Sequence, residues 1–367
     1  MVFYLFDKMG WAISSNPILN LIMDKKPIIL ISNDWHIKED NCQQITDLVR
    51  QKIITARSYG CEYLACLGDV FNSRKHQSQQ VLQTFKNILD EVLSNSLKLI
   101  VIPGNHDKTV YEHKESFLDP FEYHPALELI RDYGAITIGG VEFQFIPFFT
   151  EERWLQYYED NVHFSKGNIQ ILCSHIAVTG SRNNDGKKVE NVIKPSLFRK
   201  FDKVLLGHYH DHQKIGDNIY HLPSIQQNNF GENQNKGFTF IYDDGSIEVI
   251  NSKFKLFKTV KIDLDTISKK ELNELITENS VFVDSTNIRF SFTGNESKLK
   301  SINKESIRSL GIDVKVINKD IEVIDDFDQI AIVKYNNDSI LEELNIFCKD
   351  NNLDFETAKN YFNGMGN

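Results

Sequence analysis

Histidine, aspartate and asparagine residues gather in five short clusters between residues 34 and 210. Imidazole, carboxylate and amide groups in one site favour Mn, Fe or Zn over Ca or Mg alone. Alternate residues of an extended segment share one side, so Asp34 and His36, or His208 and His210, can face one ion. The clusters are Asp34-Trp35-His36, Gly68-Asp69, Gly104-Asn105-His106-Asp107, Ser174-His175 and Gly207-His208-Tyr209-His210.

This donor set suits a pair of divalent ions. Two ions about 3.5–4 Å apart and bridged by a carboxylate orient a phosphate, lower the pKa of water and stabilise charge in the transition state. Glycines precede Asp69, Asn105 and His208 and allow the backbone to turn sharply and approach the ions. One such cluster alone is weak support, but five in series, each behind an expected strand, favour one shared site over unrelated surface residues.

Short apolar runs stand directly before the clusters and predict strands. Helical spacing of apolar residues predicts helices over Cys42–Ser58 and Gln79–Leu93. The alternation of strands and helices predicts a largely parallel sheet, which binds ligands at the carboxyl ends of its strands. Gly139-Gly140, between two β-rich runs, predicts a hairpin turn. The strands are expected over Pro27–Ser32, Tyr63–Leu67, Leu97–Ile102, Ile169–Cys173 and Lys203–Leu206.

Three further parts are expected around this main domain of residues 27–253. Residues 254–317 read as a small α+β domain, with strands over Phe254–Leu264, Ile288–Phe292 and Ile312–Ile317 and helices over Lys269–Ile276 and Ser297–Leu310. An acidic linker (318–330) and a helical tail (331–367) follow. The tail's apolar stripe either docks on its own protein or binds a partner, and its place beyond the linker favours a partner. The stripe consists of Leu341, Leu344, Phe347, Phe355, Tyr361 and Phe362.

Composition and the N-terminus set further limits. The five cysteines form no CxxC pair, which is typical of a reducing compartment. No run of about 18 apolar residues predicts a membrane span. Residues 1–26 leave two interpretations open: either Met23 is the natural start, or the segment forms an ordered N-terminal helix.

The five clusters resemble the motif series of the calcineurin-like metallophosphoesterase superfamily, D-x-H, G-D, G-N-H-D/E, H and G-H-x-H, over residues 28 to about 212. The resemblance implies a four-layer α/β/β/α sandwich and two divalent ions, with Mn²⁺ expected. It implies that His106 is a non-ligand histidine that protonates the leaving oxygen or stabilises the transition state, and that Asp107 orients His106. It assigns one metal to Asp34, His36 and His210, the second to Asn105, His175 and His208, and the bridge to Asp69.

Other segments resemble the Mre11/SbcD-type DNA nuclease subunits, and in particular their phage T4-like branch. They are Gly68-Asp69-Val70-Phe71, Pro103–Asp107, and Asn229-Phe230-Gly231-Glu232 followed by Lys236-Gly237-Phe238. This resemblance implies a DNA endo- or exonuclease in recombination, repair or replication, in the cytoplasm of a bacterial or phage-infected cell. Residues 254–317 would be its capping domain. The helical tail would bind a Rad50/SbcC-type coiled-coil ATPase, and a homodimer is left open.

One residue departs from the cellular pattern. Cellular members have a histidine, linked to exonuclease action, where this chain has Asn72. Endonuclease activity is therefore the firmer expectation. The T4-like branch also lacks this histidine, so its absence does not break the resemblance.

The net charge of −10 argues against a binder that relies on bulk positive charge. Residues 318–367 carry −7 of it, which assigns the tail to a protein partner, whereas residues 251–317 carry +3. The candidates for DNA contact are Arg74, Lys75, Arg182, Lys187 and Lys188, which could equally be solvated surface cations. Two alternatives stay open: a small-molecule phosphodiesterase or phosphatase with the same metals, and a catalytically silent scaffold subunit.

Overall fold

The computed structural model describes residues 25–184 and 186–319, together with residues 348, 355 and 359. The predicted N-terminal extension lies outside the described residues except for its last two. Of the six tail residues expected to bind a partner, only Phe355 is described; it is helical and half-buried. In the described part of the chain, no helix is long and apolar enough to cross a membrane.

The first sheet contains six strands in the order β12-β11-β1-β2-β3-β4. Strands β1 to β4 are parallel, and β11 and β12 add an antiparallel edge. Every residue of β1 is buried, which explains its continuous apolar sequence. The bounds are β1 Pro27–Ser32, β2 Tyr63–Cys66, β3 Lys98–Val101, β4 Leu127–Leu129, β11 Gly237–Tyr242 and β12 Ile247–Asn251.

The second sheet also contains six strands, in the order β5-β6-β7-β8-β10-β9. Its central strands β6, β7, β8 and β10 are parallel. The predicted hairpin at Gly139-Gly140 is confirmed, because Ile138 pairs with Val141 and both glycines have positive φ. The bounds are β5 Gly134–Ile138, β6 Val141–Ile146, β7 Ile169–Ser174, β8 Lys203–Leu206, β9 Gln213–Ile215 and β10 Ile219–His221.

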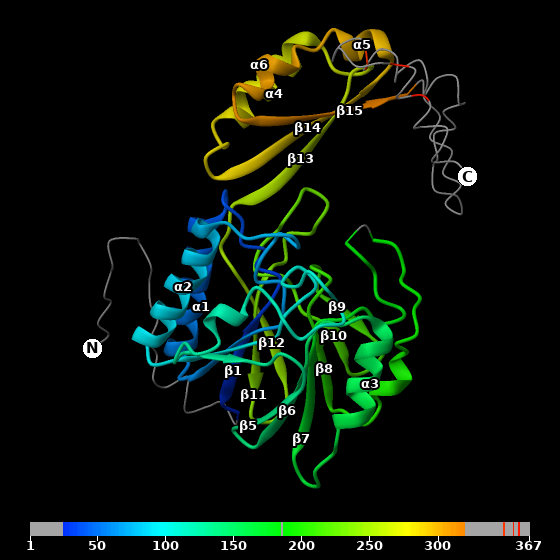
Figure 1. Cartoon of the computed structure of the whole chain (residues 1–367). Coiled ribbons are helices and arrows are strands. Elements are labelled where there is room, and N and C mark those ends of the chain that lie inside the picture. Colours follow the sequence, from blue (N-terminus) through cyan, green and yellow to red (C-terminus); the bar gives the residue numbers. More distant parts are fainter. Residues whose placement is uncertain (1–24, 185, 320–347, 349–354, 356–358, 360–367) are drawn as a thin grey trace.

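The two sheets pack face to face, and helices cover both outer faces (Figure 1). Side chains such as Ile29, Ile31, Phe143 and Phe145 fill the space between the sheets. The predicted four-layer α/β/β/α sandwich is therefore the observed fold. The helices α1 Cys42–Ser58 and α2 Gln79–Ser94 cover the first sheet, α3 Glu151–Asn161 and the short helix Pro195–Phe198 cover the second, and a further short helix spans Asp119–Phe121.

Residues 256–318 form a separate small sheet with its own core. Its three strands are parallel, and the helices between them pack on one face. The single helix predicted over Ser297–Leu310 is wrong: it is two helices, because the Asn303 side chain accepts the N–H of Ser306 and starts the second one. The bounds are β13 Leu256–Asp263, α4 Lys269–Ser280, β14 Thr286–Gly294, α5 Glu296–Lys300, α6 Lys304–Arg308 and β15 Ile312–Asn318.

The small domain lies beyond one end of the sandwich, with its strands between its helices and the main domain (Figure 1). Strand β15 ends at Asn318, so the first residue of the predicted linker is still paired in this sheet. Residues 320–330 of that linker lie outside the described residues.

Candidate metal centre

All seven candidate ligands lie in loops that directly follow strands. Two follow β1, one follows β2, one follows β3, one follows β7 and two follow β8. The order of the sheets brings these strand ends to one rim, although His36 and His210 are 174 positions apart in the sequence. Six of the seven are buried and the seventh, His208, is half-buried: Asp34, His36, Asp69, Asn105, His175, His208 and His210.

Asp34, His36 and His210 form one group of donor atoms. Each offers one oxygen or nitrogen, and these atoms all lie within 4.8 Å of one another. Nε2 of His36 is 3.1 Å from Nε2 of His210. Oδ2 of Asp69 lies 3.7 Å from Nε2 of His36, at the border of this group.

Asn105, His175 and His208 form a second group. Oδ1 of Asn105 lies 3.1 Å from Nε2 of His175 and 2.9 Å from Nδ1 of His208. Oδ1 of Asp69 is 3.4 Å from Nε2 of His175. One carboxylate oxygen of Asp69 thus faces each group, as a bridging ligand requires.

Hydrogen bonds from the far ring nitrogens orient two of the histidines. Nδ1 of His175 donates to the carbonyl oxygen of Leu67 at 2.6 Å. Nδ1 of His210 donates to Oε1 of Glu232 at 2.8 Å. In both rings Nε2 is left for the site, which is the arrangement that second-sphere partners give to metal-binding histidines.

The backbone is strained at four of the candidate ligands. Asp34, His36, Asp69 and His208 have φ values of 54°, 48°, 54° and 84°, in the left-handed region that non-glycine residues rarely adopt. Such conformations cost free energy and cluster at functional sites. Within the described residues, only Ser96 shares this conformation among non-glycine residues.

Glycines let the loops approach one another. A Cβ on Gly104 would lie 2.2 Å from Oδ1 of Asp69, and one on Gly68 would lie 2.3 Å from Nδ1 of His175. Gly68 also has a φ of +91°. At both positions a side chain would occupy the space that a candidate ligand needs.

The electrostatics fit bound cations. Asp34 is fully buried, and among the described residues no lysine or arginine forms an ion pair with it; burial raises its pKa. Burial also lowers the pKa of His36 to about 3. For His175, burial alone would lower the pKa, but the charge of Asp69 and the hydrogen bond to it raise it to about 9. Because an uncompensated buried carboxylate is costly, these donors suit divalent ions.

His106 stands beside the ligands at the mouth of the site. Its Nδ1 donates to the carbonyl oxygen of Asn72 at 2.6 Å. Its Nε2 then accepts from Nη2 of Arg74 at 2.8 Å. Arg74, a candidate for DNA contact, therefore lies at the centre itself.

Asp107 does not have the role expected of it. We expected its carboxylate to orient His106, but the partner of the His106 ring is the Asn72 carbonyl. Asp107 instead accepts the backbone N–H groups of Phe71 and Gly104, each at 2.8 Å, and of Val70 at 3.2 Å. It thereby joins the loop after β2 to the loop after β3, and burial and the Asp69 charge raise its pKa to about 7.

The other DNA-contact candidates lie outside the centre. Lys75 is exposed beside Arg74 but does not line the site. Arg182, Lys187 and Lys188 are exposed on the loop after His175, where Arg182 donates to the carbonyl oxygen of Gly186. It is Asn184 of this loop that reaches the centre: its Oδ1 accepts the backbone N–H of His210 at 2.9 Å.

Several residues of the centre were not foreseen from the sequence. Glu232 holds His210, and Lys236 contacts both Glu232 and the His210 carbonyl oxygen. The segments that contain both residues resemble the nuclease subunits, but the resemblance assigns no role to either residue. No sequence pattern pointed to Asn184, because its contact depends on how the loop after His175 packs against the loop after β8.

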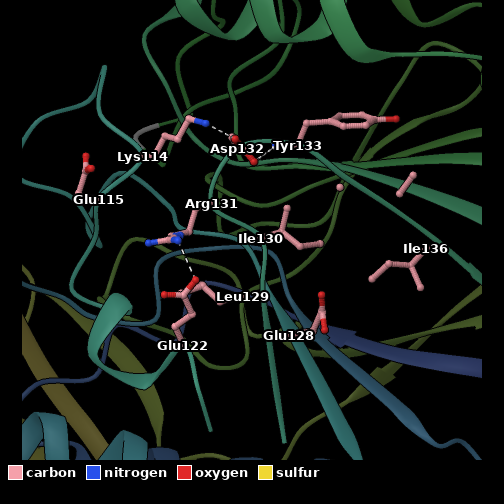
Figure 2. Close-up of a pocket in the computed structure, with 12 residues that line it drawn as sticks. Lys114, Glu115, Glu122, Glu128, Leu129, Ile130, Arg131, Asp132, Tyr133 and Ile136 are labelled. Carbon is pink, nitrogen blue, oxygen red and sulfur yellow. Dashed lines mark hydrogen bonds and ion pairs between the residues drawn. The ribbon is translucent and has the colours of Figure 1, made fainter. Parts of the chain in front are cut away.

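An open hollow of about 290 Å³ lies over the donors. Arg74, Asn184, Tyr209, Asn228 and Asn229 line it together with His106 and all the candidate ligands except Asp34 and His175. A larger hollow of about 420 Å³ lies between the edge strands β4 and β5 (Figure 2). Its charges face one another, Lys114 toward Asp132 and Arg131 toward Glu122, and it contains none of the candidate ligands.

Solved structures and one family model are similar to this chain. Among solved structures, the chain is similar to a dimetal phosphatase from Danio rerio, with 11% identity, 59% of this chain and 93% of that chain covered, and a TM-score of 0.37. It is also similar to the nuclease MPE from Pseudomonas putida, with 16% identity, 53% and 67% covered, and a TM-score of 0.26. The sequence model for calcineurin-like phosphoesterases matches residues 28–212, which is just over half of the chain and includes all five clusters. The chain therefore belongs to the calcineurin-like phosphoesterase family.

Proposed function

We propose that this protein is a two-metal phosphodiesterase that cuts DNA as the nuclease subunit of an Mre11–Rad50/SbcCD-like complex. The observation that carries the proposal is the convergence of the complete donor set with His106 and Arg74 in one open hollow. Buried carboxylates and strained backbone conformations lower the stability of a protein. A catalytically silent scaffold would gain nothing that offsets this loss.

We assign the ligands by the side of Asp69 on which they lie. Asp34, His36 and His210 would hold one ion, Asn105, His175 and His208 the other, and Asp69 both. We propose Mn²⁺ for both positions, because the mixed nitrogen and oxygen donors suit it. When bound, the ions supply charge stabilisation for the phosphate and lower the pKa of water.

His106 and Arg74 are placed to act on the phosphate. The Asn72 carbonyl fixes the His106 ring so that Nε2 faces Arg74 and the hollow. We assign to His106 the transfer of a proton to the leaving oxygen, from an Nε2 that takes up this proton when Arg74 turns from the ring to the phosphate. We assign to Arg74 a charge-assisted hydrogen bond to a non-bridging phosphate oxygen, since guanidinium groups match phosphate geometry.

The capping domain supports a long, anionic substrate. Strand register places Lys261 and Lys315 on the sheet face opposite the helix-packed residues, where Arg289 is paired with Asp313. Figure 1 shows the strands on the side of that domain nearer the main domain. Cations on this face suit the phosphates of a nucleic acid that extends beyond the hollow.

The test compares DNA with a small ester under the same conditions. Single- and double-stranded oligonucleotides and bis(p-nitrophenyl) phosphate are incubated with the full chain and Mn²⁺, with and without a Rad50/SbcC-type ATPase. We expect cleavage of both substrate classes and greater cleavage of duplex DNA with the ATPase. Cleavage of the small ester alone, with and without the ATPase, would identify a small-molecule phosphodiesterase instead.

The partner is tested through the tail. A double substitution Leu344→Asp and Phe347→Asp places charges in the predicted apolar stripe, so it should abolish co-elution with the ATPase. Hydrolysis of bis(p-nitrophenyl) phosphate should be retained, because neither residue belongs to the metal centre. Co-elution that survives the double substitution would remove the tail from the proposal.

A further inference from the structure

Glu232 connects a metal ligand to a segment outside the five motifs. Its Oε1 accepts from Nδ1 of His210 at 2.8 Å, and its Oε2 pairs with Nζ of Lys236 at 2.9 Å. Lys236 also donates to the carbonyl oxygen of His210 at 2.8 Å. His210 is thus held at both its ring and its backbone by these two buried side chains.

The same segment holds Glu232 in place from the other side. Asn229 donates to Oε1 at 2.8 Å, and the Asn228 backbone N–H donates to Oε2 at 3.2 Å. Gln227 donates to the Glu232 carbonyl oxygen at 2.8 Å. Residues 227–232, called here the coupling segment, therefore form one hydrogen-bonded unit around the Glu232 carboxylate.

The capping domain docks on this coupling segment. The backbone N–H of Phe257, in β13, donates to Oε1 of Gln227 at 2.9 Å. The Phe257 and Phe230 rings meet edge to face, with centroids 4.9 Å apart. The Arg289 guanidinium, from β14, lies 4.0 Å from the centroid of the Phe230 ring. Two strands of the capping domain thus contact Phe230, which lies two positions before Glu232 in the sequence.

We propose that Glu232 is a positioning residue for His210, and that the docking of the capping domain on Phe230 sets its position. The capping domain then controls how well one of the two metal positions is formed. The inference rests on the proposed role of His210 as a metal ligand. In this arrangement the Glu232 carboxylate orients the imidazole of His210 and raises its basicity, as carboxylates do for metal-binding histidines.

The test measures Mn²⁺ binding to the full chain by titration calorimetry. Glu232→Ala should weaken one of the two Mn²⁺ sites by about 10–100-fold and leave the other at its wild-type affinity. Glu232→Gln, which keeps an acceptor oxygen for Nδ1 of His210, should restore part of the loss. Retention of the second site also shows that the variant is folded.

A matched control distinguishes the positioning of His210 by Glu232 from the general effect of removing a buried glutamate. Glu142 has the same exposed fraction as Glu232, 6%, and hydrogen bonds to Ser165 and Gln170 in the second sheet. Glu142→Ala should leave both Mn²⁺ sites unchanged. Equal binding by wild type and Glu232→Ala would overturn the inference, whereas a wild type that binds no metal would overturn the proposed function itself.

The contribution of the capping domain is tested at Phe230. Phe230→Ala should weaken the same site as Glu232→Ala, by a smaller factor, because it removes only the docking contact. Phe164→Ala is its control: that ring lies 4.9 Å from the Phe201 ring and 5.4 Å from Nζ of Lys200, away from the centre. Wild-type binding in Phe230→Ala would remove the capping domain from the inference.

Discussion

The guanidinium of Arg74 lies 2.8 Å from Nε2 of His106, and the opposite ring nitrogen of His106 is bound to the Asn72 carbonyl. The described residues contain no carboxylate that forms an ion pair with Arg74. This cation is therefore held at the metal centre by the histidine alone. An incoming phosphate offers it a stronger, charged acceptor.

Arg74→Ala should lower kcat for bis(p-nitrophenyl) phosphate by about 10²-fold, since charge-stabilising donors in active sites contribute on this scale. Mn²⁺ binding should be unchanged, because Arg74 is not a ligand. Lys75→Ala is the control, since the neighbouring cation does not line the hollow. If the two variants hydrolyse the ester equally well, Arg74 does not bind the phosphate as proposed.

His106→Ala should lower kcat by about 10²–10⁴-fold, the range of general acid–base catalysis. The variant should still bind two Mn²⁺ ions with wild-type affinity. Asn72→Ala should be close to wild type on the small ester, because the contact to His106 uses the backbone carbonyl of Asn72. Loss of Mn²⁺ from His106→Ala would show that this histidine is a ligand.

Gly104→Ala should abolish most metal binding and activity. The new Cβ would lie 2.2 Å from Oδ1 and 2.3 Å from the backbone nitrogen of Asp69, which must then move away from one or both ions. Gly140→Ala serves as the comparison, because its Cβ would meet no atom within 4 Å and the variant carries only the backbone cost of φ +84°. Calorimetry with Mn²⁺ and ester hydrolysis measure both, and normal metal binding by Gly104→Ala would contradict the geometry of the centre.

Mn²⁺ affinity should rise with pH. The pKa of His175 in the metal-free protein is raised to about 9, so the ring is protonated at neutral pH and must lose its proton to bind an ion. Below that pKa, one released proton makes the affinity of this site rise about tenfold per pH unit. Titrations between pH 6 and 8, in buffers of different ionisation enthalpy, count the protons directly. Affinity that does not change with pH would mean that His175 is already neutral in the metal-free protein over this range.

Lys52 should make stability depend on pH. It is fully buried, donates to the Ser32 hydroxyl and the Ala65 carbonyl, and has a pKa lowered by burial to about 7. In the unfolded chain the pKa of lysine is about 10.4. Between these values the unfolded state binds one proton more, so the free energy of unfolding rises with pH, by about 1.4 kcal/mol per unit.

Lys52→Met should remove this slope. Urea unfolding at pH 7.5, 8.5 and 9.5 measures it against wild type. Lys166→Met, at an exposed lysine, should keep the wild-type slope. Identical slopes for Lys52→Met and wild type would mean that Lys52 is charged in the folded protein.

Local patterns sufficed for much of this fold. The apolar spacing of Cys42–Ser58 predicted α1 to the residue, since α1 buries the side chains that define its period. The continuous run PIILIS predicted β1, since every residue of β1 is buried. The prediction of one helix over Ser297–Leu310 failed. The apolar periodicity continues through this region, but the Asn303 cap starts a second helix within it. The short edge strand β4 was not predicted, because its three residues carry little pattern.

Residue types and their spacing were enough to identify the side chains that could bind metals and to predict that each follows a strand. The packing of the loops shows that one oxygen of Asp69 faces each group of donors, and that Asn72 rather than Asp107 fixes His106. It also shows that Glu232 lies behind His210. Residue types and spacing are local properties of the sequence. The turns with positive φ at the ligands and the contacts between distant loops depend instead on strand order and on how the two sheets pack.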